Sequence, residues 1–206
     1  MPVKSRRDEY TEATRAALLD AAAAAFAAHG FARTSVEDIV RGARLTKGAL
    51  YHHFDDKTAL FEAVFCRIEE GLVAKVAEAS AKHDDPWARM EAGLGAFFDA
   101  ALRPENRRIV FEEAPAALGW LRWRELEQRY MMGVLRGALR ALHDARLIDA
   151  EPLDLVAPVV FGAVAEAAQM AARERDGKAA QRAAKRLILQ LLRALKPARR
   201  GRTPSA

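Results

Sequence analysis

Residues 34–57 constrain the fold of this 206-residue chain more than any other segment. They predict two short helices joined by a tight turn. Ser35 can cap the first helix, because its hydroxyl can accept a hydrogen bond from a free amide of the first turn, and this helix is expected to end near Ala43. Thr46 can cap the second helix, which is expected to span residues 47–54. Two short helices with this spacing are typical of a helix-turn-helix.

The outer face of the second helix has an uncommon composition. Leu50 and Phe54 are expected to point inward, which leaves small, aromatic and cationic side chains outside. Small residues permit close approach to base edges, and lysine, tyrosine and histidine can donate hydrogen bonds to phosphates or bases. The outward residues are Lys47, Gly48, Ala49, Tyr51, His52 and His53. This face favours DNA binding, and an ordinary surface helix with its tyrosine packed on a neighbour is the alternative.

From Arg15 to about Val64 the sequence resembles the DNA-binding domain of the tetracycline-repressor (TetR) family of transcription regulators. The resemblance rests on an alanine-rich helix that ends in FAAHG at residues 26–30, on Phe31, Thr34 and Ile39, and above all on LTKGALYHHF at residues 45–54, followed by Lys57 and Leu60. It covers about a quarter of the chain. The rest has the length and helical pattern of the regulatory domain of that family.

The resemblance implies which residues contact DNA. The expected set is Thr34, Ser35, Arg44, Thr46, Lys47, Gly48, Ala49, Tyr51, His52 and Lys57. Within it, Thr34, Tyr51, His52 and Lys57 are expected at phosphates, and Lys47, Gly48 and Ala49 are expected to face the bases.

Arg44 departs from the family pattern, which usually has glycine at this point of the turn. A non-glycine residue held at positive φ costs about 1 kcal/mol. The turn therefore either tolerates this strain or has a different geometry. Arg44 is also within the segment where a guanidinium could reach a phosphate.

The overall charge gives little support for nucleic-acid binding. The formal net charge is +5 and the isoelectric point about 9.6, but residues 1–57 contain nine cations against eight acids. Much of the excess lies at the C-terminus, in Arg193, Lys196, Arg199, Arg200 and Arg202. The prediction of DNA binding therefore depends on local placement of side chains and not on a basic domain.

The single cysteine, Cys66, excludes an internal disulfide and a cysteine-based metal cluster, which fits a reducing compartment. The N-terminal charges are not followed by a hydrophobic region, and the alanine-rich run at residues 21–28 is too short to span a bilayer. We therefore expect a soluble cytoplasmic protein that does not associate with a membrane.

Helical periodicity throughout the chain predicts an all-α fold of about nine helices, with an N-terminal three-helix domain and a larger C-terminal domain. Beyond the helix-turn-helix we expect helices at 11–29, 56–83, 86–102, 104–114, 120–144, 152–174 and 178–195, with Pro104 and Pro115 among the residues that separate them. The expected parts are a flexible basic arm at 1–10, the DNA-binding domain at 11–57, a linking helix at 58–84, a ligand-binding and dimerisation domain at 85–196, and a disordered basic tail at 197–206.

The last two expected helices differ from the others in composition. Residues 152–174 are rich in alanine and also contain Pro158 and Gly162, and residues 178–195 carry an apolar stripe that includes Leu187 and Leu191. The resemblance implies that these helices pair with their copies in a second subunit as a four-helix bundle. The alternative is that they only close the core of one subunit. A dimer would let two recognition helices read two half-sites.

Aromatic residues and methionines are concentrated in the middle of the chain, where the family has its ligand pocket. Such residues can line an adaptable apolar cavity, and plain core packing is the alternative. The expected walls are Phe111, Trp120, Trp123, Met131 and Phe161, and the expected polar contacts are Glu112, Glu166 and Gln169. A buried glutamate among them would favour a cationic ligand, whereas a glutamate on a solvated helix face would not.

These observations predict a ligand-responsive, DNA-binding transcriptional regulator. In the leading hypothesis it is a repressor that leaves a palindromic operator when a small apolar or aromatic molecule binds its C-terminal domain. A helical small-molecule carrier or sensor without DNA binding is the second hypothesis. An enzyme is not expected, because no histidine has a glutamate three residues before it and no phosphate-binding loop, nucleophile elbow or CxxC motif is present. We expect no metal and no cofactor.

Overall fold

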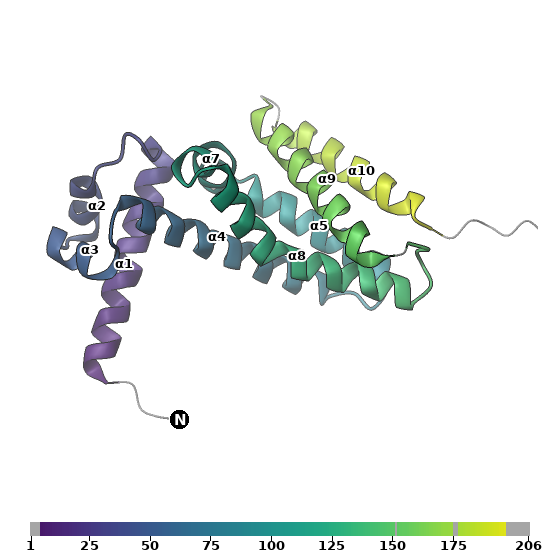
Figure 1. Cartoon of the computed structure of the whole chain (residues 1–206), viewed down its shortest axis with the longest axis horizontal. Coiled ribbons are helices and arrows are strands. Elements are labelled where there is room, and N and C mark those ends of the chain that lie inside the picture. The colour runs from purple at the N-terminus through teal and green to yellow at the C-terminus, as the bar shows by residue number, and fades with distance from the viewer. Residues whose placement is uncertain (1–4, 151, 175–176, 197–206) are drawn as a thin grey trace, which may run out of the picture. The chain divides into compact units, whose positions relative to one another are not determined.

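The computed structural model describes residues 5–150, 152–174 and 177–196 (Figure 1). These residues form helices and no strand, which confirms the predicted all-α class. The elements are α1 (Arg6–His29), α2 (Val36–Ala43), α3 (Lys47–His53), α4 (Lys57–Ser80), α5 (Pro86–Ala101), α6 (Pro104–Arg107), the π-helix η1 (Arg108–Glu113), α7 (Ala114–Ala117), α8 (Trp120–Asp144), α9 (Leu153–Arg173) and α10 (Gly177–Ala194). The expected basic tail at 197–206 lies outside the described residues.

The chain divides into two compact units. The first contains Met1–Gly71 and Arg103–Glu127, and the second contains Leu72–Leu102 and Gln128–Ala206. Because α6 and η1 pack on α1, the segment that contains them belongs with the helix-turn-helix.

Helix α1 begins at Arg6, five residues before the expected start at Thr11. Ser5 and Asp8 form a capping box: the Ser5 hydroxyl accepts from the Asp8 amide at 3.2 Å, and the Asp8 carboxylate accepts from the Ser5 amide at 3.3 Å. This cap satisfies two amides that would otherwise lack partners. Residues 6–10 are therefore helical, not the flexible arm expected from the sequence, and residues 1–4 lie outside the described part.

The far end of α1 is closed by Gly30, whose φ of 81° is readily available only to glycine. The Gly30 amide donates to the Phe26 carbonyl at 2.8 Å. Phe26, Phe31 and Phe61 then form a ring cluster with centroid separations between 5.0 and 5.9 Å. This aromatic core ties α1 and α4 to the loop that precedes the helix-turn-helix.

The helix-turn-helix has the predicted caps. The Ser35 hydroxyl accepts from the Asp38 amide at 3.1 Å, and the Thr46 hydroxyl accepts from the Ala49 amide at 3.1 Å. Between the two helices Arg44 adopts the left-handed conformation, with φ 56° and ψ 40°. The turn therefore accepts the strain of a non-glycine residue there.

Asp56 precedes helix α4, and its carboxylate accepts from the Ala59 amide at 2.7 Å. It ends at Ser80, three residues before the expected end at His83. Asp85 then caps α5 by accepting from the Ala88 amide at 2.8 Å.

Pro115 does not end the helix that starts at Pro104, although the sequence predicts a break there. The helical turn becomes wider in η1, because the Ala114 amide donates to the Ile109 carbonyl, five residues earlier instead of four. A wider turn accommodates a proline, which lacks an amide and would clash with the carbonyl four residues before it in an α-helix. Helical structure therefore continues to Ala117.

In the second unit α9 and α10 run side by side (Figure 1), and α10 also packs on α5. The buried face of α9 is made mostly of alanine, with Phe161 and Gln169. Of the described helices, α9 alone is long and apolar enough to cross a membrane. This is weak support for a membrane segment, because core helices of soluble proteins pass the same test.

Candidate functional site

The outer face of α3 presents the chemistry predicted for DNA contact. Leu50 is fully buried and Phe54 is 6% exposed, so these two residues hold the helix against the core. Lys47, Gly48 and His52 are exposed, and 52% of Tyr51 is exposed. The structure therefore turns the small, aromatic and cationic side chains outward on a short helix whose position is fixed by its cap and its buried anchors.

Lys47 is paired within the helix-turn-helix. Its ammonium forms an ion pair with the Glu37 carboxylate of α2, and both side chains are about half exposed. The hydrogen bond from Lys47 lowers the pKa of Glu37, and the same bond raises the pKa of Lys47. Glu37 therefore competes with any phosphate or base that approaches the Lys47 ammonium.

Thr34 has a different place from the one predicted. Its side chain is 2% exposed, and its hydroxyl donates to the Gly30 carbonyl at 2.7 Å and lies 3.2 Å from the Ala25 carbonyl. A hydroxyl held in this way cannot reach a phosphate. Thr34 instead closes the loop between α1 and α2.

Lys57 supports the same loop and stays half-buried. Its ammonium donates to the Phe31 carbonyl at 2.9 Å and to the Thr34 carbonyl at 3.0 Å, and it lies 4.3 Å from the centroid of the Phe31 ring. An ammonium has three donors, so two of them are used inside the protein. The third is the one that remains for a phosphate.

The other residues expected at the DNA are the two caps, Ser35 and Thr46, together with Arg44 in the turn and Ala49 on α3. Arg44 and Thr46 are exposed, and Ser35 and Ala49 are half-buried. The hydroxyls of Ser35 and Thr46 already accept from backbone amides, so their first role is to cap α2 and α3.

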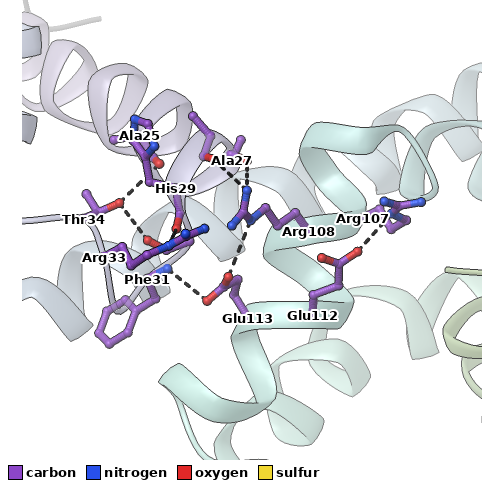
Figure 2. Close-up of polar contacts among 12 residues, drawn as sticks. Ala25, Ala27, His29, Phe31, Arg33, Thr34, Arg107, Arg108, Glu112 and Glu113 are labelled. Carbon is purple, nitrogen blue, oxygen red and sulfur yellow. Dashed lines mark hydrogen bonds and ion pairs between the residues drawn. The ribbon is translucent and has the colours of Figure 1, made fainter. Parts of the chain in front are cut away.

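A polar cluster that the sequence did not reveal joins η1 to the end of α1 (Figure 2). Arg108 Nη1 donates to the carbonyls of Ala27 and Ala28 at 3.0 and 2.8 Å. Glu113 Oε2 accepts from the Phe31 amide at 3.0 Å, and Glu113 Oε1 lies 3.5 Å from Arg108 Nε. We call Arg108 and Glu113 the η1 latch.

The η1 latch was hidden in the sequence because its two residues are five apart. In an α-helix that spacing places side chains on different faces, and pairs three or four apart are the usual signal. The π-helix brings them together. Gly30 contributes as well, since a Cβ atom there would collide with the Glu113 carboxylate.

The residues expected to bind a ligand fall into both units and differ in burial. Phe111 is 8% exposed and Trp123 is fully buried in the first unit, and Phe161 and Gln169 are each 7% exposed in the second. Met131 is half-buried. These residues have the burial expected of a pocket wall or of a core.

Three of the expected ligand contacts lie at the surface instead. Glu112 is exposed and pairs with Arg107 at 3.1 Å. Glu166 is exposed, and 56% of Trp120 is exposed. The two glutamates are therefore solvated helix-face charges, the alternative that the sequence left open.

Two other glutamates are buried. Glu69 of α4 is 2% exposed and Glu127 of α8 is 6% exposed. Burial raises the pKa of Glu69 to about 8, helped by the neighbouring Glu127, and raises the pKa of Glu127 to about 7 against the opposing effect of Arg124. The signal for Glu69 was present in the sequence, because it lies four residues after Phe65 and three before Leu72, on the apolar side of α4.

Comparison with known proteins gives matches over both parts of the chain. Residues 18–64 match the family model for bacterial regulatory proteins of the tetR family, and residues 87–195 match the model for the tetracyclin repressor-like C-terminal domain. A solved structure of a TetR-family transcriptional regulator from Pectobacterium atrosepticum is 32% identical, with a TM-score of 0.82 over 95% of this chain and 99% of that one.

Two curated proteins show the same relation. The TetC protein of transposon Tn10 from Escherichia coli is 24% identical over 164 residues, 79% of this chain and 82% of TetC. The transcriptional repressor KstR2 of Rhodococcus jostii is 36% identical over 99 residues, 48% of each chain. Members of this family are soluble DNA-binding regulators that act as dimers and respond to ligands. The exposed α3 face, the fold and these matches together show that the chain belongs to the TetR family of transcriptional regulators.

Proposed function

We propose that this protein represses transcription by binding a palindromic operator as a homodimer, and that a small apolar or aromatic molecule releases it. The observation that carries the proposal is the outer face of α3, where Lys47, Gly48, Tyr51 and His52 are exposed on a helix that is capped and anchored. The name of KstR2 supports repression in place of activation.

In this proposal α3 enters the major groove with Lys47, Gly48 and Ala49 toward the bases. Tyr51 and His52 donate to phosphates, since both are exposed on the same helix. Phosphate contacts fix the register of a protein on DNA, and base contacts give the sequence preference.

Further contacts come from the edges of α3. The Ser35 hydroxyl already donates to Asp38 Oδ2, so it belongs to the cap of α2. The third donor of Lys57, the guanidinium of Arg44 and the hydroxyl of Thr46 are the groups that remain for phosphates. These groups contribute to affinity for any sequence, because a phosphate carries no information about the base.

The proposed dimer forms through α9 and α10. Nine large apolar side chains are exposed among the described residues, and five of them lie on these two helices: Leu155, Val159, Met170, Leu187 and Leu191. Exposed apolar side chains that are grouped on neighbouring helices often mark an interaction site on a protein surface. A two-fold axis would pair the same face of both subunits.

In this proposal, the η1 latch couples ligand binding to a change in the position of the helix-turn-helix. Arg108 and Glu113 hold the end of α1 and the Phe31 amide, which precede the helix-turn-helix directly. A ligand that binds better when η1 has moved would shift the population toward a form whose two α3 helices no longer fit successive grooves. Phe111, inside η1, and Trp123, Met131, Phe161 and Gln169 remain candidate ligand contacts.

The test is a fluorescence anisotropy titration of a labelled duplex taken from upstream of the protein's own gene. We expect saturable binding that weakens steeply with salt, as phosphate contacts require, and a stoichiometry of two chains per palindrome. Binding that is absent, or unchanged between low and high salt, would instead support the carrier or sensor.

The double variant Leu187→Glu, Leu191→Glu tests the dimer in the same assay. Four buried charges per dimer would oppose association, so light scattering should report a monomer and operator affinity should fall by about 100-fold or more. Arg182→Glu, Arg186→Glu on the same helix controls for added negative charge. A double variant that remains dimeric would contradict the assignment of α9 and α10.

A further inference from the structure

An ion pair joins the two helices of the helix-turn-helix at their first turns. Helices α2 and α3 pack on each other (Figure 1), and the ammonium of Lys47, the first residue of α3, contacts the carboxylate of Glu37, the second residue of α2. The Lys47 and Glu37 side chains are 54% and 52% exposed, so the contact lies at the surface. The outer face of α3 therefore presents an acid beside its lysine.

The first turn of α3 is an unfavourable place for a lysine. The N-terminus of a helix carries a partial positive charge, and the first turn of α3 contains no acid. Glu37 supplies a negative charge from α2, whose own first turn favours an acid. The pair has no net charge, so it adds little to a general attraction for phosphates. A neutral pair at this face is better suited to reading bases than to binding the DNA backbone.

The ion pair also limits where Lys47 can bind. If the ammonium moves from Glu37 to a phosphate, the Glu37 carboxylate loses its partner beside a row of negative charges. An unpaired charge that faces a like charge opposes binding. Lys47 can therefore leave Glu37 without this penalty only where the DNA also offers a hydrogen-bond donor to the carboxylate.

One kind of base pair offers both partners side by side in the major groove. Guanine presents two neighbouring acceptors, N7 and O6, and the paired cytosine presents the N4 amino group as a donor next to O6. A lysine ammonium can donate to both guanine atoms, and a glutamate can accept from cytosine N4. An ammonium and a carboxylate in contact thus match the neighbouring groups of a G·C pair.

We propose that Lys47 and Glu37 together read one G·C base pair in each half-site of the operator. The ion pair opens over the base pair: Lys47 donates to guanine N7 and O6, and Glu37 accepts from cytosine N4. Glu37 is then a specificity-determining residue of the DNA interface. This inference rests on the proposed function, in which α3 enters the major groove.

The other base pairs fit the two side chains less well. Adenine presents N7 next to the N6 amino group, so the ammonium finds one acceptor there in place of two adjacent ones. The paired thymine presents the acceptor O4, which repels the Glu37 carboxylate, and a methyl group. At an A·T pair the two charges that separate are therefore incompletely replaced, and Glu37 rejects the wrong base pair as much as it binds the right one.

The first test selects duplexes with a randomised centre by binding to the full-length protein. We expect wild-type protein to enrich a palindrome with a G·C pair at one symmetric position that Glu37→Ala no longer requires. Anisotropy titrations then compare duplexes that carry each base pair at this position in both half-sites. Wild type should prefer G·C at least about tenfold, and Glu37→Ala less than about threefold. Glu78→Ala is the control and should match wild type, because Glu78 pairs with Lys82 on α4.

The second test changes single atoms of the selected duplex. The base N4-methylcytosine still pairs with guanine but replaces the amino hydrogen in the major groove by a methyl group, and 7-deazaguanine lacks N7. Each base should weaken wild-type binding by about fivefold or more. The N4-methyl group should have less than a twofold effect, roughly, on Glu37→Ala, and 7-deazaguanine should have a similarly small effect on Lys47→Ala.

The wild-type protein alone carries the test if Glu37→Ala does not fold, as judged by circular dichroism, because N4-methylcytosine removes the same contact from the DNA side. Wild-type binding that ignores N4-methylation would overturn the inference. A G·C requirement that survives Glu37→Ala, or an equal effect of the methyl group on wild type and Glu37→Ala, would also overturn it.

The same selection separates this inference from the proposed function. If a palindrome is enriched but no G·C position depends on Glu37, the base-reading pair is wrong and the repressor proposal stands. If no sequence is enriched from the library, the protein does not read DNA, and the repressor proposal falls together with the inference.

Discussion

Thr34 and Glu69 are equally buried, at 2% exposure each, but the protein treats their polar groups in opposite ways. The Thr34 hydroxyl donates to a carbonyl of its own loop, whereas the Glu69 carboxyl is buried near a second acid, Glu127, and both effects raise its pKa. The first arrangement stabilises the loop that supports the helix-turn-helix. The second costs stability, because burial disfavours an ionised carboxyl.

The difference extends to the surroundings of each residue. Around Thr34, the ammonium of Lys57 and the carboxylate of Glu113 form hydrogen bonds with backbone groups of the loop before the helix-turn-helix. Near Glu69, the second acid is Glu127, whose charge opposes ionisation of Glu69 and whose carboxylate accepts from Arg124 at 3.1 Å. Burial alone therefore does not show whether a polar side chain stabilises the fold.

The largest expected effect comes from removing the buried acid Glu69. Glu69→Met keeps the length of the side chain and removes the buried carboxyl. We expect the free energy of unfolding to rise by about 3 kcal/mol at pH 8.5 and by only about 1 kcal/mol at pH 5. Urea unfolding followed by circular dichroism measures both values. A variant less stable than wild type at pH 8.5 would contradict the view that the buried Glu69 carboxylate destabilises the fold.

The direction of this pH dependence follows from the raised pKa of Glu69. The unfolded chain loses the proton near the ordinary pKa of 4.5, and the folded protein keeps it until about pH 8. Between these values the folded state binds more protons, so wild-type stability falls as the pH rises, by up to about 1.4 kcal/mol per pH unit for one group. Glu127, with a pKa raised to about 7, acts in the same direction.

Thr34→Val removes a satisfied hydroxyl from an equally buried position. The Gly30 carbonyl loses its donor, so we expect the free energy of unfolding to fall by about 1–2 kcal/mol. We therefore expect the free energy of unfolding to fall in Thr34→Val and to rise in Glu69→Met, although the two positions are equally buried. Thr11→Val, at another threonine whose hydroxyl donates to a carbonyl, at 2.8 Å, is the control at an exposed site. Equal small losses for both threonines would show that burial of the Thr34 bond adds nothing.

Arg44→Gly relieves the backbone strain in the turn between α2 and α3. Glycine reaches φ near 56° without a Cβ clash, so the variant should be more stable by about 0.5–1 kcal/mol. Arg44→Ala keeps the strain and removes the guanidinium. If Arg44 contacts a phosphate, both variants lose operator affinity, although only the glycine variant gains stability. A destabilised glycine variant would mean that the arginine side chain holds the turn.

Glu37→Gln has the smallest expected effect. It removes the carboxylate that pairs with Lys47, so the lysine is available to DNA without first breaking an ion pair. We expect operator affinity to increase about twofold to fivefold at low salt and the gain to shrink at high salt. Anisotropy titrations at two salt concentrations measure this change. Asp38→Gln does not serve as a control, because Asp38 is part of the cap of α2. Glu78→Gln is the control, because Glu78 lies on α4, outside the helix-turn-helix, and pairs with Lys82.

Much of the fold could be predicted from local signals. Ser35, Thr46 and Gly30 cap helices in the structure because their chemistry acts over three or four residues, and such patterns are visible in a sequence. The capping box of Ser5 and Asp8 has the same kind of signal, and it lies in a segment where the charged composition suggested flexibility. Helix α8 has the predicted bounds of 120–144.

The remaining features depend on contacts between distant segments. The η1 latch needs a π-helix at Arg108–Glu113 and the end of α1, which are about eighty residues apart in the sequence. Thr34 is buried because its hydroxyl bonds to carbonyls at the end of α1. The family resemblance predicted a phosphate contact for Thr34, and it gave no sign of this burial. The buried acids could be suspected only at Glu69, where the apolar periodicity of α4 includes a charge.

The most direct test of DNA reading by α3 compares two lysines in one titration series. Lys47 and Lys82 are both exposed and both paired with a glutamate, but only Lys47 lies on α3. We predict that Lys47→Ala weakens binding to the upstream duplex by about tenfold or more and lowers its salt dependence, whereas Lys82→Ala leaves both unchanged. Equal effects of the two substitutions, or no effect of Lys47→Ala, would contradict the assignment of α3 as the DNA-reading helix.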